Sequence, residues 1–236
     1  DEAMQAIAAR AAELNAPLIS VADQPSAIEA DNNHDLQSLG RYRLRYQGCN
    51  AHLNLRGRHQ TTNAMTAIRI VEQLNQAGWK IEKTAIEKGL SSIEWPARLQ
   101  LIQSQMLPAP LLLDGAHNPA GAQVLWDFLN DHCQEFSITM IFGAMQDKAL
   151  TEIAEILFPA ARQVILTKVK NARAAAPEKI AELIGNDQFT VVCTDSIAEA
   201  LAEAARGIET TATASNLIVA CGSLYLAGEL LSYLTT

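Results

Sequence analysis

The sequence predicts an α/β protein in which helices cover both faces of a mainly parallel β-sheet. Two observations predict this fold class. From Trp95 onward, short apolar runs recur without the alternation of a half-exposed strand, and amphipathic segments of helical period separate them. Parallel strands buried on both faces have this continuous apolar character, and the helices that connect them cover the sheet.

The elements of this C-terminal part can be assigned in chain order. Strands are expected at residues 111–113, 138–142, 164–166, 190–193 and 217–220. Helices are expected near residues 120–129, 150–157, 177–184, 197–205 and 224–234. This regular alternation is typical of βαβ units.

The N-terminal part of the chain has a different organisation. Apolar residues recur at helical spacing from the first turn, at Met4, Ile7, Ala8, Ala11 and Leu14. We therefore expect the chain to begin inside a larger fold. Residues 17–22 are apolar and predict a strand, whereas the polar stretch 23–40 predicts a loop.

A hairpin and two helices follow. Residues 41–46 and 51–55 alternate polar with apolar side chains around a turn that contains Gly48, which predicts an antiparallel hairpin. A helix is expected from Thr61 or Thr62 to Gly78, and a short one at residues 83–88. The change of pattern places a domain boundary near Gly89, between domains 1–89 and 90–236, with residues 89–95 as a hinge.

Composition excludes several classes of protein. The chain of 236 residues has 18 Lys and Arg against 26 Asp and Glu, a formal net charge of −8, without a visible basic cluster. Such a chain is repelled by phosphate backbones and anionic lipid, so nucleic acid and membrane partners are not expected. The four cysteines are widely spaced, and no signal peptide or long apolar run occurs. We expect a cytoplasmic monomer with reduced thiols.

Residues 111–121 carry the richest set of polar groups at a strand end. Asp114 and Gly115 leave the strand, and His117 and Asn118 precede Pro119, which suits the first turn of a helix. Ligands of open parallel sheets bind at the carboxyl ends of strands, and a helix start favours anions. The alternative is that Asp114 and Asn118 only satisfy backbone groups in the turn.

Two further strand ends are weaker candidates. Lys148 follows Asp147 after one strand, and the two could equally form a solvated ion pair at a helix start. Ser223 follows the last strand outside a GxSxG pattern, which disfavours serine hydrolysis. Neither GxGxxG nor GxxxxGK[ST] occurs in the chain, so the two common phosphate-binding loops are absent from it.

Five segments in order resemble the folylpolyglutamate synthase and dihydrofolate synthase family of the Mur ligase superfamily. They are Gly57 to Gln60 with Asn63-Ala64, Trp95-Pro96-Ala97-Arg98-Leu99, Asp114-Gly115-Ala116-His117-Asn118-Pro119, Phe142-Gly143 with Asp147-Lys148, and Gly222-Ser223-Leu224-Tyr225. The DGAHNP element is the most specific. Ala97 departs from the pattern, since the family usually has Gly at this position.

The resemblance implies a fold and a reaction. The fold is a Rossmann-like C-terminal domain preceded by the tail of a P-loop-type central ATPase domain. The reaction uses ATP and Mg²⁺ to convert a pteroate or folate carboxylate to an acyl phosphate, which the amino group of glutamate attacks. Which of the two synthase activities is present does not follow from these residues.

The resemblance also implies residue roles. Asn63, Arg98 and Asp114 match ATP-contacting positions, so Arg98 and Asp114 should face one cleft. His117 matches a position close to glutamate or the acyl phosphate, and Lys148 and Ser223 are weaker substrate-binding candidates. Metal ligands are expected outside this chain, which should be inactive alone. A non-catalytic nucleotide-binding module and another Mur-type amino-acid ligase are the alternatives.

Overall fold

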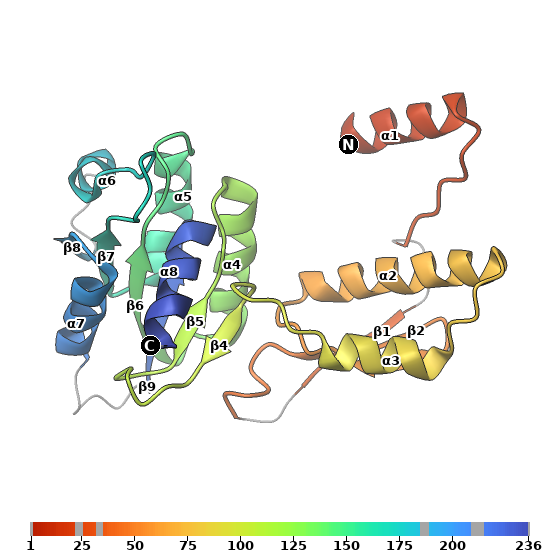
Figure 1. Ribbon diagram of the computed structural model, residues 1–236, viewed down its shortest axis with the longest axis horizontal. Coiled ribbons are helices and arrows are strands. Elements are labelled where there is room, and N and C mark those ends of the chain that lie inside the picture. The colour runs from red at the N-terminus through yellow and green to blue at the C-terminus, as the bar shows by residue number, and fades with distance from the viewer. Residues whose placement is uncertain (1, 22–25, 32–34, 185–188, 209–214, 236) are drawn as a thin grey trace.

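The computed structural model describes residues 2–21, 26–31, 35–184, 189–208 and 215–235 (Figure 1). Two lobes are visible. We call residues 26–92 the N-terminal lobe and residues 97–235 the C-terminal lobe. Helix α1 (Glu2–Glu13) stands apart from both lobes in Figure 1, and none of its residues is buried.

The C-terminal lobe is built on a six-stranded sheet of order β4-β5-β9-β6-β7-β8. Its strands are β4 (Gln100–Ile102), β5 (Leu111–Leu113), β6 (Phe136–Phe142), β7 (Gln163–Thr167), β8 (Thr190–Thr194) and β9 (Ser215–Cys221). All neighbouring pairs are parallel except β4 and β5. The carboxyl ends of five strands therefore share one edge, as the α/β fold class requires.

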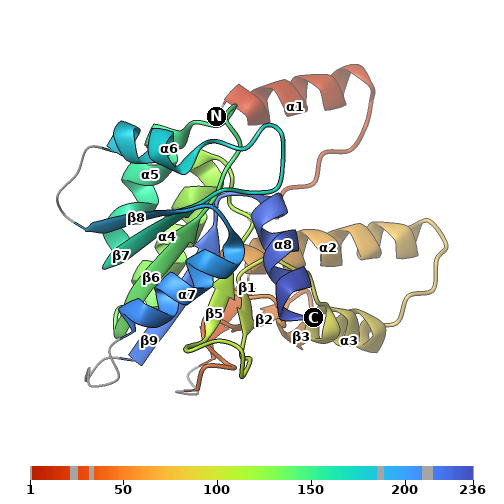
Figure 2. The same cartoon turned by 60° about the vertical axis from the view of Figure 1, so that its left-hand side comes forward.

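Helices cover both faces of this sheet (Figure 2). Helices α4 (Pro119–His132), α5 (Leu150–Leu157) and α6 (Pro177–Ile184) pack on one face, and α7 (Ile197–Gly207) and α8 (Leu224–Leu234) on the other. A short 3-10 helix, η1 (Phe158–Ala160), follows α5. The predicted parallel α/β architecture is confirmed.

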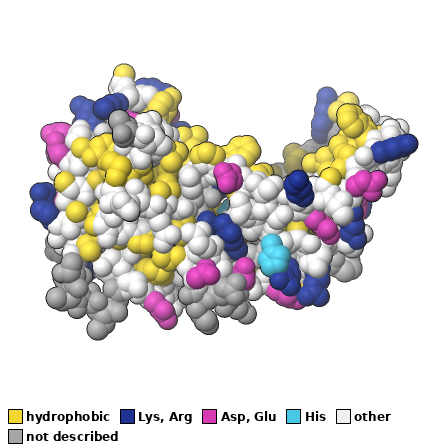
Figure 3. All heavy atoms as spheres, turned by 60° about the horizontal axis from the view of Figure 1, so that its bottom comes forward, with side chains coloured by type: hydrophobic (Ala, Val, Ile, Leu, Met, Phe, Trp, Pro, Cys, Tyr) yellow, Lys and Arg dark blue, Asp and Glu magenta, His cyan; other side chains and the backbone are white. Residues whose placement is uncertain are grey.

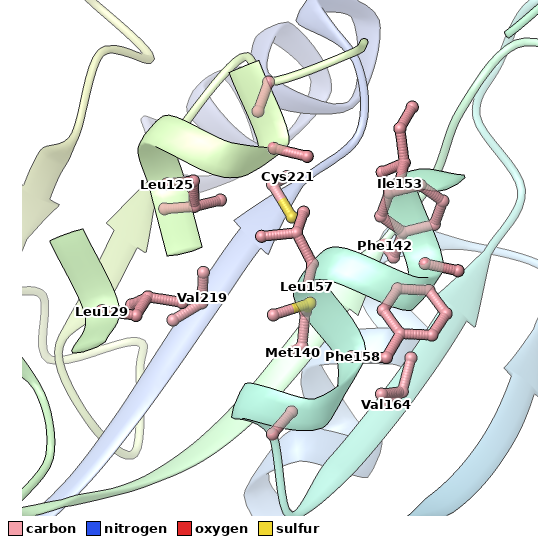
Figure 4. Packing of buried hydrophobic residues seen from close by; sticks show 14 of the residues in the cluster. Leu125, Leu129, Met140, Phe142, Ile153, Leu157, Phe158, Val164, Val219 and Cys221 are labelled. Atoms are coloured by element: carbon pink, nitrogen blue, oxygen red, sulfur yellow. The ribbon is translucent and has the colours of Figure 1, made fainter. Parts of the chain in front are cut away.

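The larger core lies between the sheet and helices α4 and α5 (Figure 4). Leu125 on α4, Met140 on β6 and Val219 on β9 are fully buried. Phe142 packs edge-on against Phe158, with ring centroids 5.2 Å apart. Burial of these side chains stabilises the lobe and holds the strand ends rigid.

The N-terminal lobe has a smaller antiparallel sheet of order β1-β2-β3. Strands β1 (Ser26–Ala30), β2 (Tyr42–Tyr46) and β3 (Cys49–His52) pack one face against helices α2 (His59–Gln76) and α3 (Lys83–Ser92). Gln47 and Gly48 have φ of 48° and 70°, so they form the two-residue turn of the predicted hairpin.

Two predictions for the N-terminal part are wrong. Residues 17–20 form no strand, and Ala22 lies outside the described residues. Leu18 and Ile19 are exposed, and no strand among the described residues pairs with them. The stretch predicted to be a loop instead contains β1, whose five residues pair antiparallel with β2. Tertiary pairing therefore overrides the weak strand propensity of its Ser, Ala and Glu residues.

Other elements differ only in their bounds, apart from one strand. Helix α2 begins at His59, and α3 continues to Ser92, so residues 89–92 of the expected hinge are helical. Strand β4 was not predicted, because three half-buried residues are too short for a pattern. The domain boundary near Gly89 stays a prediction. No described helix is long and apolar enough to cross a membrane.

The two lobes meet at α4. The Tyr42 hydroxyl lies 3.1 Å from His132 Nε2, and His132 packs against Phe128 with ring centroids 5.1 Å apart. Gly40 has φ of +62° and approaches Phe128 so closely that a Cβ would overlap the ring. The start of β2 is thus fitted directly against the C-terminal turn of α4.

Candidate functional site

A cleft of about 430 Å³ lies at the carboxyl edge of the large sheet. Its lining includes His59 at the start of α2, Trp95 and Arg98 from the segment before β4, and Asp114 and His117 after β5. The two lobes therefore both contribute to it. Arg98 and Asp114 face one shared cleft, as the sequence predicts.

The segment 95–99 has an unusual backbone that presents Arg98. Ala97 and Leu99 have φ of 56° and 46°, the left-handed region that glycine adopts most easily. The Ala97 N–H donates to Gln100 Oε1 at 2.9 Å, and its carbonyl accepts from the Gly115 N–H at 2.8 Å. Ala97 and Leu99 are buried, whereas Arg98 is exposed at the cleft.

Asp114 is held by backbone donors on both sides. Its Oδ2 accepts from the Leu99 N–H and its Oδ1 from the Ala116 N–H, both at 2.8 Å. Burial raises the pKa of this carboxyl, while the two hydrogen bonds and Arg98 act in the opposite direction. Asp114 therefore does satisfy backbone groups, as the alternative interpretation expects, and each oxygen retains a lone pair for a ligand.

His117 is oriented by its own loop. Its Nδ1 lies 2.8 Å from the Gly115 carbonyl oxygen. A carbonyl can only accept, so Nδ1 carries the proton in this bond and Nε2 has a free lone pair in the neutral ring. Such an imidazole can accept a proton or a hydrogen bond from a group in the cleft.

The N-terminus of α4 borders the same cleft. The Asn118 side chain caps the helix by accepting from the Gly121 N–H at 2.8 Å, and Pro119 occupies the first turn, as predicted. The positive end of the helix dipole therefore faces the lining. Gly115 leaves room for Leu224, which a Cβ at this position would overlap.

His59 and Trp95 are lining residues that were not among the predicted site residues. His59 lies in the first turn of α2, where burial and then Arg98 lower the pKa of its imidazole. Trp95 is 60% exposed at the cleft. Both residues belong to the sequence motifs, which could have marked them as site residues. A histidine close to the start of a helix can equally be a loop residue without a function, so the motif alone did not select His59.

Asn63 lies near this cleft but is not part of its lining. It is exposed on α2, four residues after His59 and on the same helix face. Its Nδ2 donates to Gln60 Oε1 at 2.9 Å. Asn63 does not cap the helix, since the N-cap is Arg58, which makes no side-chain capping bond.

Lys148 and Ser223 lie at the same sheet edge but outside the lining of the cleft. Lys148 is half-buried, with its Nζ 3.6 Å from Asp147 Oδ2. Ser223 is 3% exposed, and its Oγ accepts from the Leu226 N–H at 3.0 Å. The hydroxyl thus caps α8, which is a structural role.

The lining is suited to an anion. An exposed guanidinium, two histidines and a helix N-terminus converge on it, and Asp114, the one carboxylate among the described lining residues, is already engaged by backbone N–H groups. Arginine binds phosphate and carboxylate oxygens through its planar donors. Among the described residues, no group of three or more His, Cys, Asp or Glu is arranged to hold a metal ion.

A parallel α/β sheet with this cleft at its carboxyl edge defines a ligand-binding domain of the Rossmann-like class. Residues 97–224 match the family described as Mur ligase, glutamate ligase domain. The chain therefore belongs to the Mur ligase family, and the resemblance seen in the sequence is confirmed.

Similar proteins agree with this assignment. The chain is 34% identical to folylpolyglutamate synthase of Lacticaseibacillus casei, over 72% of this chain and 37% of the relative. It is 29% identical to dihydrofolate synthetase of Saccharomyces cerevisiae, over 77% and 45%. A solved Mycobacterium tuberculosis folylpolyglutamate synthase, complexed with ADP and AMPPCP, shares the fold with a TM-score of 0.81 at 23% identity, over 99% and 53%. The chain thus spans about half or less of these proteins.

Proposed function

We propose that this chain is part of an ATP-dependent ligase of folate metabolism, which joins L-glutamate to dihydropteroate or a folate through an acyl phosphate. The observation that carries the proposal is the shared cleft of Arg98, Asp114 and His117. The names of the similar proteins support the substrate class. Membership of the Mur ligase family supports the formation of an amide bond.

Each lining residue has a proposed role that its contacts allow. Arg98 binds phosphate oxygens of the nucleotide, because its guanidinium is exposed at the cleft and has no carboxylate ion pair among the described contacts. Asp114 accepts hydrogen bonds from ribose hydroxyls through its remaining lone pairs. His117 contacts glutamate or the acyl phosphate through Nε2, the ring nitrogen that its loop leaves free.

We also propose ligand-binding roles for Asn63, Lys148 and Ser223, although these residues lie outside the lining of the cleft. Asn63 shares a helix face with His59, so it would approach a nucleotide that extends along α2. Lys148 and Ser223 follow neighbouring strands, β6 and β9, and would approach the glutamate side of the reaction. Closure of one lobe on the other would bring such groups together and exclude water from the acyl phosphate.

The donor set of the cleft fits the triphosphate of ATP, since its cationic side chain has no competing carboxylate ion pair within the described part of the chain. When bound, ATP supplies the phosphoryl group that activates the carboxylate, and Mg²⁺ neutralises charge on the phosphates. We propose that metal ligands and the phosphate-binding loop belong to a segment outside this chain, because GxxxxGK[ST] does not occur in it. The chain alone should then bind nucleotide weakly.

Titration of the chain with ADP at millimolar concentrations, followed by isothermal calorimetry, tests the site. Arg98→Gln should weaken ADP binding about tenfold, the value expected for a lost charge-assisted hydrogen bond. Arg206→Gln is the matched control, because Arg206 is exposed on α7 and pairs with Glu203 away from the cleft. Equal affinity of both variants for ADP would refute a nucleotide site at Arg98.

A second assay tests the reaction. The chain is incubated with ATP, glutamate and either dihydropteroate or folate, and release of ADP is measured. We expect no turnover by the chain alone. Robust ADP release would contradict the proposal that catalysis needs a further segment.

A further inference from the structure

A second cleft, of about 230 Å³, lies between the lobes. Its lining adjoins the first cleft, because Trp95, Pro96 and Arg98 line both. Two more arginines line it from the N-terminal lobe, Arg41 and Arg56. Figure 3 shows dark-blue basic side chains where the two lobes meet.

Arg56 is a buried charge with few partners. Only 6% of the residue is exposed. Its Nη2 donates to the Gln37 carbonyl oxygen at 3.0 Å, and its Nε is buried without a hydrogen-bond partner among the described residues. A guanidinium has five N–H donors, and leaving them unpaired in a protein interior is costly.

Arg41 increases this cost. It is half-buried directly before β2, and its Nε is also buried without a partner within the described part of the chain. Burial and the positive charge of Arg41 lower the pKa of Arg56 to about 10. Two like charges are therefore held close together in a partly desolvated place.

Among the described residues, the acids near these arginines form no ion pair with them. Glu94 is the one carboxylate in the lining of the second cleft, and it is exposed and makes no ion pair among the described contacts. Asp35 is close enough to Arg41 to interact electrostatically, but its Oδ1 accepts from the Ser38 N–H at 2.6 Å. Asp114, near Arg98, accepts from two backbone N–H groups.

We propose that the second cleft binds a phosphate group, held by Arg41 and Arg56 from the N-terminal lobe and Arg98 from the C-terminal lobe. A doubly charged oxyanion offsets the repulsion between the guanidinium groups that line the cleft, and arginine recognises it with bidentate geometry. The volume suits one phosphate group and a few waters. Its source is either free inorganic phosphate or the terminal phosphate of a nucleotide in the adjoining cleft.

This inference goes beyond the proposed function and does not depend on ligase activity. The phosphate would add a charged bridge between two lobes that already contact each other, for example at Tyr42 and His132. Its binding should therefore stabilise the chain against unfolding, because only the folded chain brings the three arginines together.

The test measures the melting temperature of the chain against the concentration of inorganic phosphate, with sodium chloride keeping the ionic strength constant. For the unaltered chain we expect a saturable rise. Arg56→Gln and Arg41→Gln should each weaken the apparent phosphate affinity at least tenfold. Arg58→Gln is the matched control, because Arg58 is exposed, close in sequence and absent from the lining of both clefts.

Several outcomes would overturn the proposal: no saturable effect of phosphate, or an equal loss of affinity in the Arg58→Gln variant. If Arg56→Gln does not fold, Arg41→Gln alone decides, since Arg41 is only half-buried. A parallel titration with ADP identifies the source. Competition between ADP and phosphate indicates a nucleotide phosphate, and additive stabilisation indicates free phosphate. Phosphate binding without ADP binding would support this site and refute the nucleotide site.

Discussion

The backbone N–H of Leu99 donates a 2.8 Å hydrogen bond to Asp114 Oδ2, which ties the segment before β4 to the loop after β5. Arg98 lies between two residues in left-handed backbone conformations, so its direction depends on this bond. Asp114 therefore positions Arg98, in addition to any contact that it makes with a nucleotide.

Asp114→Ala should lower the free energy of unfolding by about 2–4 kcal/mol, because the buried N–H groups of Leu99 and Ala116 lose their acceptors. Urea unfolding measures this change. Asp127→Ala is the control, since Asp127 is exposed on α4 and should change stability by less than about 0.5 kcal/mol. Similar stability of the two variants would show that the carboxylate is not structural.

Ala97→Gly should stabilise the chain by about 0.5–1 kcal/mol. A non-glycine residue in the left-handed region costs roughly 1–2 kcal/mol, and glycine removes this cost. Part of the gain is offset, because glycine also increases the conformational entropy of the unfolded chain. Ala97 has φ of 56°, which also explains why this position favours glycine. The control is Ala67→Gly, exposed within α2, which should destabilise by about 1 kcal/mol. A lower free energy of unfolding for Ala97→Gly would show that the backbone at Ala97 is not strained.

The C-terminal lobe was largely predictable from the sequence because its periodicity is strong. The expected strand 111–113 and helices 150–157 and 177–184 agree with the structure residue by residue. The N-terminal lobe was less predictable, since β1 depends on its pairing with β2 rather than on its own composition. An apolar run such as residues 17–20 carries no information about whether a partner strand exists.

The candidate site was predictable only in part. Asp114, His117 and Asn118 are residue types that indicate a turn at the end of a strand. They line the same cleft because they lie within five positions of one another in the sequence. The distance between His59 and Arg98 depends on how the lobes meet, which no local pattern encodes. The second cleft was missed for the same reason, because Arg41, Arg56 and Arg98 are far apart in sequence and no basic run connects them.

Gly40→Ala should destabilise the chain by about 2–4 kcal/mol. The substitution combines a strained left-handed backbone with overlap between the new methyl group and the Phe128 ring. Gly78→Ala is the matched control: Gly78 also has positive φ, but its Cβ would point into open space. The control should therefore lose only about 1–2 kcal/mol. Equal losses in thermal unfolding would show that Gly40 is not fitted against α4.

His132 should make the stability of the chain depend on pH. Burial lowers the pKa of this imidazole below 6.5, although Asp131 acts in the opposite direction. The folded chain therefore binds a proton at His132 less readily than the unfolded chain does. Unfolding then takes up protons below about pH 6.5. The contribution of His132 to the free energy of unfolding is therefore fully present above this pH and is lost as the pH falls.

His132→Gln should reduce the loss of unfolding free energy between pH 7.5 and 5.5, measured by urea denaturation. Glutamine can still hydrogen-bond the Tyr42 hydroxyl but cannot take up a proton there. Some dependence should persist, because the pKa of His59 is lowered in the same direction. His52→Gln, at an exposed position on β3, should keep the full dependence. If His132→Gln and the unaltered chain lose stability in parallel, the interface histidine is not the titrating group.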